Sequence, residues 1–421
     1  MTTLIASWSR RADPAFAVAA TVVAAALFLL GWGVLHRGFF AHDAIVDTPV
    51  YQRYGAAMAD GKVPYRDFAV EYPPGALPVF VIPALGDPSP ETFRVRFETM
   101  MAFFGQAMIV CLAVALVALG ASRAWLIGAL CFAALAPVAL GPVVLSRFDL
   151  WPAALTAAAL CALVTGRLRL GHVALGAAIA AKLYPAVLAP LAVIYVWRRE
   201  GRREGLVCAG LMLGVVVLAF APFVVLAPGG VWDSLWNQAS RPLQIESLGA
   251  GFLLVAHHVF GSGVTVESSH GSQNLAGTGP DVFAVGQSVL QAAALLATWI
   301  LFARGPATPS RLLLGSAAAL VAFVSLGKVL SPQFLIWLIP VIPLVAGRRG
   351  LTAATLLAAA LVLTQLWFPY RYWDLALHFG TLESWLVLAR DLALVGLLAV
   401  LVWGLLDRDT ERLAARRFSL P

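Results

Sequence analysis

The sequence predicts an all-α, polytopic membrane protein. Of its 421 residues, 61% are hydrophobic and only 12% are charged. Soluble domains are about 45–50% apolar, so a soluble fold would leave too much apolar surface in water. A membrane-spanning helix needs about 20 mostly apolar residues, and the chain offers about 12 such segments, some of them short or re-entrant. We therefore expect one membrane domain over residues 1–421.

The first apolar run covers residues 14–35 and follows Arg10, Arg11 and Asp13. It is too long for the core of a signal peptide, and no small-residue cleavage site follows, so we expect a retained first span. Further spans are expected at 97–119, 124–141, 148–165, 205–227, 281–303, 311–328, 333–346, 351–368 and 384–406.

The apolar run at 172–197 is interrupted at Pro185. Proline lacks the amide donor and clashes with the preceding helical turn. Arginines flank both ends of the run, at 167 and 169 and at 198 and 199. If both flanks lie on one side of the membrane, the run enters and returns as two short helices.

The basic residues predict the orientation. Seventeen arginines fall on one side of this layout, together with both termini, and positive residues mark the cytoplasmic side. Residues 36–96 and 228–280 are then long outer loops. The net charge of +7 reflects this orientation and gives no support to a nucleic-acid partner. The 26 arginines against three lysines indicate a GC-rich bacterial genome, and hence a bacterial plasma membrane.

The first outer loop concentrates acids in a chain that has few charges. Five carboxylates fall within residues 43–74: Asp43, Asp47, Asp60, Asp67 and Glu71. Asp47 precedes Thr48 and Pro49, which suit the start of an interfacial helix over 50–58. Asp47 is therefore either a simple N-cap or a base that takes a proton from an acceptor hydroxyl.

Glu71 and Tyr72 precede two prolines, which fix an extended entry into the segment 73–85. They either face a cavity or form an interfacial turn. The prolines make 73–85 a poor full span, so we expect it to lie in the interface or to re-enter.

Three basic residues lie in or beside apolar spans: Arg147, Lys182 and Lys328. A charge at the bilayer centre costs several kcal/mol, so such residues usually face a cavity or a partner. For Lys328 the alternative is snorkelling to the interface. For Arg147 the alternative is a local pair with Asp149.

The second outer loop contains Arg241, Glu246, His270 and Gln273. These side chains either bind sugar hydroxyls or are simply solvated. The sequence contains no phosphate-binding loop, zinc motif or nucleophile elbow. We name no metal ligands and no organic cofactor, and leave a divalent cation open. The four cysteines lie in apolar runs and suit small buried hydrophobes.

Several short motifs resemble, in their order, the GT87 (DUF2029) family of GT-C polytopic glycosyltransferases, typified by mycobacterial polyprenyl-phosphomannose-dependent mannosyltransferases. The resemblance covers residues 40–346. The motifs are D-x-x-V-Y at Asp47, G-x-x-P-Y at Gly61, Y-P-P at Tyr72, R-F-D at Arg147, K-L-Y-P at Lys182 and K-V-L-S-P-Q at Lys328.

The resemblance implies a polyprenyl-phosphate sugar donor, an inverting transfer and Asp47 as general base. The family often has N-Q-S in its later loop, where this chain has Ser272-Gln273-Asn274. We expect the substrates to be bound by Tyr51, Glu71, Tyr72, Arg147, Asp149, Lys182, Tyr184, Arg241, Glu246, His270, Gln273, Lys328 and Gln333.

The expected function is transfer of a sugar, mannose or another hexose or pentose, to a lipid or glycan acceptor at the extracytoplasmic face. A transporter or lipid-linked-sugar flippase is the alternative, because broken helices and intramembrane lysines also occur in transporters. A transporter would also be expected to show an internal repeat and midplane acids, and neither is visible. A non-catalytic membrane assembly subunit is a further alternative.

Overall fold

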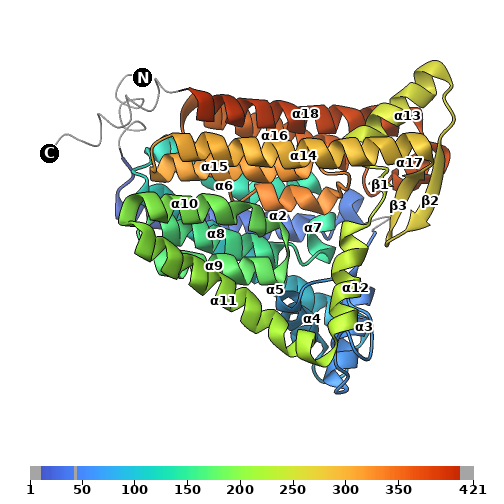
Figure 1. Cartoon of the computed structure of the whole chain (residues 1–421), viewed down its shortest axis with the longest axis horizontal. Coiled ribbons are helices and arrows are strands. Elements are labelled where there is room, and N and C mark those ends of the chain that lie inside the picture. The colour runs from blue at the N-terminus through green and yellow to red at the C-terminus, as the bar shows by residue number, and fades with distance from the viewer. Residues whose placement is uncertain (1–10, 42–44, 408–421) are drawn as a thin grey trace.

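The computed structural model describes residues 11–41 and 45–407, and the prediction of an all-α membrane protein is confirmed. Six of the helices are long and apolar enough to cross a membrane. They run side by side with shorter apolar helices (Figure 1). The six are α2 (Pro14–Val34), α5 (Pro90–Ala118), α6 (Arg123–Leu140), α11 (Arg202–Leu226), α14 (Thr278–Arg304) and α18 (Thr381–Leu406).

Shorter helices complete the bundle. The predicted interruption near Pro185 is present, because α9 ends at Ala181 and a 3-10 turn leads into the next helix. Arg169, near the start of α9, pairs with Glu204 at the start of α11, so the two ends of the interrupted run lie side by side. These elements are α8 (Leu150–Val164), α9 (Leu168–Ala181), η3 (Tyr184–Leu188), α10 (Ala189–Glu200), α15 (Pro309–Ser325) and α16 (Gly347–Gln365).

One predicted span is wrong. Residues 333–346 do not form an α-helix; they form two 3-10 segments, η4 (Pro332–Leu338) and η5 (Ile342–Leu344). Pro340 and Pro343 remove amide donors that a continuous α-helix would need. Apolar composition alone therefore predicted a helix that the prolines prevent.

The first long loop folds into short helical pieces. These are η1 (Gly38–Ala41), α3 (Thr48–Ala59), η2 (Pro74–Ala76) and α4 (Leu77–Ala84). The predicted helix over 50–58 is present as α3. It packs closely on α4, since a Cβ at Gly55 would lie 2.2 Å from the Phe80 carbonyl oxygen. The pair fixes the position of the residues just before α3.

The second long loop contains a small antiparallel sheet that the sequence did not predict. The strand order is β1-β3-β2, and β2 and β3 are joined by a tight turn. His270 and Gly271 form this turn at φ 55° and 68°, the left-handed pair that two-residue hairpins favour. The loop comprises α12 (Pro228–Ala239), β1 (Leu243–Gln244), α13 (Leu248–Phe260), β2 (Thr265–Ser269) and β3 (Ser272–Ala276).

Arginine contacts gather at the end of the bundle where α2 begins and α18 ends. Arg123 pairs with Asp13 at 2.6 Å, and Arg349 pairs with Asp407 at 3.2 Å. The three strands lie at the opposite end of the bundle (Figure 1). The described part of the chain thus separates the long loops from most of the arginines, while the side that faces the cytoplasm stays a prediction.

Candidate functional site

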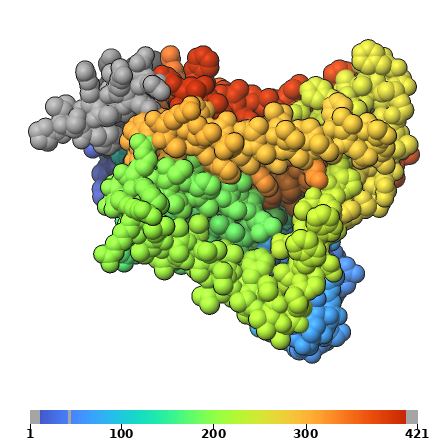
Figure 2. All heavy atoms as spheres, viewed as in Figure 1, coloured from blue at the N-terminus to red at the C-terminus, as the bar shows by residue number. Residues whose placement is uncertain are grey.

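A cavity of about 770 Å³ lies between the two long loops and the adjoining helix ends. The surface is hollowed between α12 and α14 (Figure 2). Twelve of the predicted site residues line the cavity: Asp47, Glu71, Tyr72, Arg147, Lys182, Tyr184, Arg241, Glu246, His270, Gln273, Lys328 and Gln333. Residues that lie far apart in sequence are thus brought to one place.

Two predicted site residues, Tyr51 and Asp149, do not line the cavity. Both are fully buried behind its wall. The Tyr51 ring stacks on Phe80 with centroids 4.6 Å apart, and its hydroxyl donates a hydrogen bond to Asp47 at 3.3 Å. In this structure Tyr51 and Asp149 can act only through neighbouring side chains.

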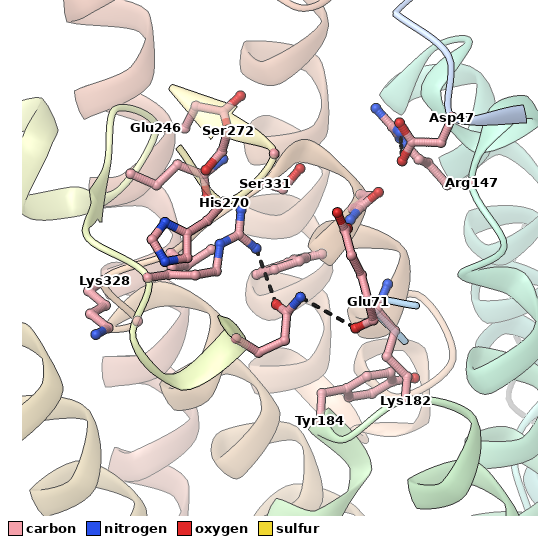
Figure 3. Close-up of a pocket in the computed structure, with 18 of the residues that line it drawn as sticks. Asp47, Glu71, Arg147, Lys182, Tyr184, Glu246, His270, Ser272, Lys328 and Ser331 are labelled. Atoms are coloured by element: carbon pink, nitrogen blue, oxygen red, sulfur yellow. Dashed lines mark hydrogen bonds and ion pairs between the residues drawn. The ribbon is translucent and has the colours of Figure 1, made fainter. Parts of the chain in front are cut away.

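Asp47 stands at the N-cap position of α3, but its side chain does not cap the helix. Its carboxylate instead forms an ion pair with Arg147 (Figure 3). The N-cap alternative therefore does not describe the side chain. The carboxylate remains 29% exposed at the cavity.

The remaining acids of the first loop lie elsewhere, apart from Glu71. Asp60 is exposed at the end of α3, and Asp67 pairs with Arg66 at 2.9 Å. The Arg66 guanidinium lowers the pKa of Asp67 to about 2. Asp43 lies outside the described residues. The four described acids of the sequence cluster are therefore not all gathered at the cavity.

The alternative prediction for Arg147 was a local ion pair with Asp149. The structure does not show that pair. Asp149 Oδ1 accepts a hydrogen bond from Lys182 Nζ at 2.6 Å and another from the Trp337 indole. The ammonium of Lys182 also lies 4.5 Å from the centroid of the Phe148 ring. Lys182 is thus held over an aromatic face by a buried carboxylate.

Tyr184 forms part of the same side of the cavity. Its ring stacks on Trp337 with centroids 4.2 Å apart, and its hydroxyl lies 3.3 Å from the Thr156 hydroxyl. α9 ends at Ala181, and Tyr184 and Pro185 begin the 3-10 turn η3. The break in the helix thus places both Lys182 and Tyr184 at the cavity. Gln333, at the start of η4, lines the wall nearby.

Glu71 and Arg241 are connected through Gln238. The Gln238 amide donates to the Glu71 carbonyl at 3.4 Å, and Arg241 donates to the Gln238 side-chain oxygen at 3.5 Å (Figure 3). Burial raises the pKa of the Glu71 carboxyl, and the positive charge of Arg241 acts against this shift. No described residue donates a hydrogen bond to the Glu71 carboxylate.

Arg241 and Lys328 are cavity cations without a carboxylate partner within ion-pair distance among the described residues. Lys328 Nζ donates to the Ala239 carbonyl at 3.1 Å. Burial lowers the pKa of Arg241, and Glu71 and Glu246 oppose this only from longer range. This side of the cavity therefore presents positive charge that the described protein leaves uncompensated.

Glu246 lies just after β1 and is 2% exposed. The Gln244 side chain donates to its carboxyl group, and Arg390 of α18 donates to its carbonyl at 2.7 Å. Burial raises the pKa of Glu246 to about 8. Its carboxyl group is therefore protonated at neutral pH.

His270 and Gln273 belong to the hairpin that closes this side. His270 sits in the β2–β3 turn, with Nε2 3.5 Å from the Ser240 hydroxyl. Gln273 donates to the Ser268 hydroxyl at 3.2 Å. Both therefore reach the cavity because the turn folds the second loop back over it.

Sequence reasoning missed several lining residues. They include Gln244, Gln291, Tyr372 and Trp373. Tyr372 begins α17 (Tyr372–His378), in the short segment between the last two long helices. Aromatic and charged residues gathered between two apolar runs were the available signal for that segment.

Within the ranges 11–41 and 45–407, no group of three or more His, Cys, Asp or Glu side chains is arranged to hold a metal ion. The carboxylates at the cavity are paired with basic or amide groups or stand apart. The chemistry that the described residues support uses a carboxylate, basic side chains and hydroxyl partners.

Fold and site thus define a polytopic membrane protein with a charged cavity at one end of its helical bundle. No family model matches the chain, and no curated protein matches it in sequence. The GT87 resemblance therefore stays a prediction.

Two similar solved structures are those of ArnT from Cupriavidus metallidurans. The form bound to undecaprenyl phosphate is 17% identical, with a TM-score of 0.48, over 94% of this chain and 79% of that chain. The apo form is 17% identical, with a TM-score of 0.46, over 90% and 76%. No residue role is carried over from either structure.

Proposed function

We propose that this protein is a membrane glycosyltransferase. It transfers a sugar from a polyprenyl-phosphate donor to a hydroxyl of a lipid or glycan acceptor. One observation carries the proposal: the same cavity contains the carboxylates Asp47 and Glu71 and the uncompensated cations Arg241 and Lys328. Sugar transfer from a phosphate needs both kinds of group.

The chemistry divides between the two kinds of group. The acceptor oxygen attacks the anomeric carbon, the bond from that carbon to the phosphate oxygen breaks, and its electron pair leaves with the phosphate. Basic side chains stabilise the charge that develops there, so no acid is required. The acceptor attacks from the face opposite the phosphate, which inverts the anomeric centre, and a carboxylate on that face takes the acceptor proton. Asp47 is the base that the sequence predicts.

The surroundings of the cavity suit a lipid-linked donor. Ser288 and Gln291 of α14 line the cavity, while Val285 and Val289 of the same helix are strongly exposed. A membrane protein exposes such residues to lipid without cost. The phosphate head of a lipid could thus enter from beside α14 while its chain stays in the bilayer.

The polar wall formed by the second loop suits the sugar. Gln244, Ser272, Gln273 and Tyr372 offer amide and hydroxyl groups to sugar hydroxyls. Mannose or another hexose or pentose is the donor sugar we propose. The proposal places the cavity on the extracytoplasmic face of a bacterial plasma membrane, with both termini in the cytoplasm.

The test is direct transfer by purified protein in detergent. Polyprenyl-phosphate sugars with a radiolabelled sugar are mixed with lipid extracts as acceptors. We expect a labelled glycolipid and release of polyprenyl phosphate. Asp67→Asn is the matched control, because Asp67 lies in the same loop but pairs with Arg66 outside the cavity.

A transporter or flippase gives a different result in the same assay. Detergent removes the two compartments, so a protein that only moves its substrate yields no new glycosidic bond. Absence of product across a panel of hexose and pentose donors would contradict the proposed function. Movement of lipid-linked sugar in reconstituted vesicles would then favour the flippase.

A further inference from the structure

The segment Arg147-Phe148-Asp149 connects α7 (Val143–Ser146) to α8. It contacts both the Asp47 carboxylate and the Lys182 ammonium. Arg147 forms an ion pair with Asp47 of the first loop. Asp149, two residues later, accepts a hydrogen bond from Lys182 at 2.6 Å. The two adjacent charges of the segment are therefore paired with different partners on different elements.

The burial of this segment argues against direct substrate binding by all of it. Asp149 is fully buried, and Arg147 is 7% exposed. Asp149 cannot touch a substrate in this structure, because its side chain is closed off from the cavity, with Lys182 and Trp337 bonded to its Oδ1. A buried charge is retained at such a site only when it is paired.

Phe148 fixes the geometry between the two charges. Its ring is fully buried and lies 4.8 Å from the Tyr72 ring and 5.3 Å from the Phe80 ring, centroid to centroid. The ammonium of Lys182 lies over its face. The backbone turns within the segment, because Arg147 is extended (φ −113°, ψ 140°) and Asp149 has helical angles (φ −63°, ψ −22°). With Phe148 anchored between them, Arg147 and Asp149 reach separate partners.

We infer that Arg147-Phe148-Asp149 is a positioning segment. Arg147 keeps the Asp47 carboxylate ionised and directed at the cavity, and Asp149 keeps the Lys182 ammonium in place. Neither needs to contact the substrate. The inference rests on the proposed function and assigns to two residues a role other than substrate binding.

The two halves of the inference predict different kinetic defects. Removing a positive charge beside a carboxylate makes it easier to protonate, by about one to three pH units for a close pair. Arg147→Gln should therefore lower kcat and move the acid limb of the pH–rate profile upward by about that amount. Asp149→Asn should raise KM for the donor and leave the acid limb where it is.

The other charged or titratable groups around the Asp47–Arg147 pair are Tyr51, Asp149, Lys182, Glu246 and Tyr372. Asp149→Asn therefore also tests a general charge effect. Arg147→Lys keeps the positive charge, so its acid limb should lie between those of the wild type and Arg147→Gln. Arg66→Gln is the control: it removes an exposed arginine paired with Asp67, and we expect wild-type kinetics.

The experiment measures transfer against pH for these variants and for the double variant Asp47→Asn/Arg147→Gln. If Arg147 acts through Asp47, the double variant should lose no more activity than Asp47→Asn alone. An additive loss, or a slower Arg147→Gln variant with an unchanged acid limb, would overturn the inference. A wild-type protein that transfers no sugar would overturn the proposed function instead.

Discussion

The two sides of the cavity differ in how their charges are matched. On the matched wall, Asp47 pairs with Arg147 and Lys182 pairs with Asp149. On the unmatched wall, the second loop and the segment after α15 place Arg241 and Lys328 with no carboxylate within ion-pair distance among the described residues. Glu246, on the same side, is neutral at neutral pH because burial raises its pKa to about 8.

This difference indicates what each wall does. Matched charges have fixed geometry before a substrate arrives, as a positioned base and its supports require. Unmatched cations have the most to gain from an incoming anion, because it supplies the compensation that the protein omits. Under the proposed function, the base then lies on the matched wall beside Lys182, and the unmatched wall supplies the cations that gain most from the donor phosphate.

The largest expected effect is at the base. Asp47→Asn keeps the shape of the side chain but cannot accept a proton at neutral pH, so transfer should fall by about 10²- to 10⁴-fold. Donor binding, measured separately, should be retained. Glu71→Gln should have a smaller effect. Full activity of Asp47→Asn together with loss in Glu71→Gln would place the base at Glu71.

Lys182→Met tests the matched wall through stability. It leaves Asp149 buried without a countercharge, and breaking a buried pair from one side costs about 3–5 kcal/mol of unfolding free energy. Transfer should weaken as well. The measurement is chemical unfolding in detergent.

The control for this variant is the double change Lys182→Met/Asp149→Asn. It removes both charges, so most of the lost stability should return. If Lys182→Met is as stable as the unaltered protein, the Lys182–Asp149 pair does not contribute to the unfolding free energy. The idea of a matched wall would then be contradicted.

Arg241→Gln tests the unmatched wall through binding. A hydrogen bond to a charged group contributes about 1.5–3 kcal/mol, so KM for the donor should rise about 10- to 100-fold. Stability should change little, because no carboxylate loses its partner. Arg241→Lys, which keeps the charge, should recover part of the affinity. An unchanged KM in Arg241→Gln would remove the phosphate from this wall.

Glu246→Gln tests the neutral acid and should give the smallest effect. Because the pKa of Glu246 is raised to about 8 in the folded protein, the folded state holds a proton that the unfolded state releases above its own, lower pKa. Stability is therefore greatest below that lower value and falls as the pH rises towards 8, by at most about 1.4 kcal/mol per pH unit.

The variant should lose this slope, which unfolding at pH 6 and pH 8 measures. Gln keeps a donor and an acceptor in place of the protonated carboxyl group. An unchanged slope in the variant would show that Glu246 is ionised across this range.

The sequence determined the features that depend on local composition. Long apolar runs specified membrane-spanning helices, because lipid is the only solvent that suits them. Pro185 specified the break after α9, and Thr48-Pro49 specified the start of α3. Rare charges in apolar surroundings identified Arg147, Lys182 and Lys328 as cavity residues, because an unpaired charge in a membrane is costly.

Tertiary structure decided which charges meet. Asp47 lies 100 positions from its partner Arg147, and nothing in the local sequence predicts that pair over an N-cap or over a contact with Asp149. Of the four described acids between residues 45 and 74, Asp47 and Glu71 line the cavity and Asp60 and Asp67 do not. The small sheet and its turn at His270 likewise depend on pairing between distant segments. Pairing of charges and strands depends on distances in space, and those distances are fixed only when the whole bundle packs.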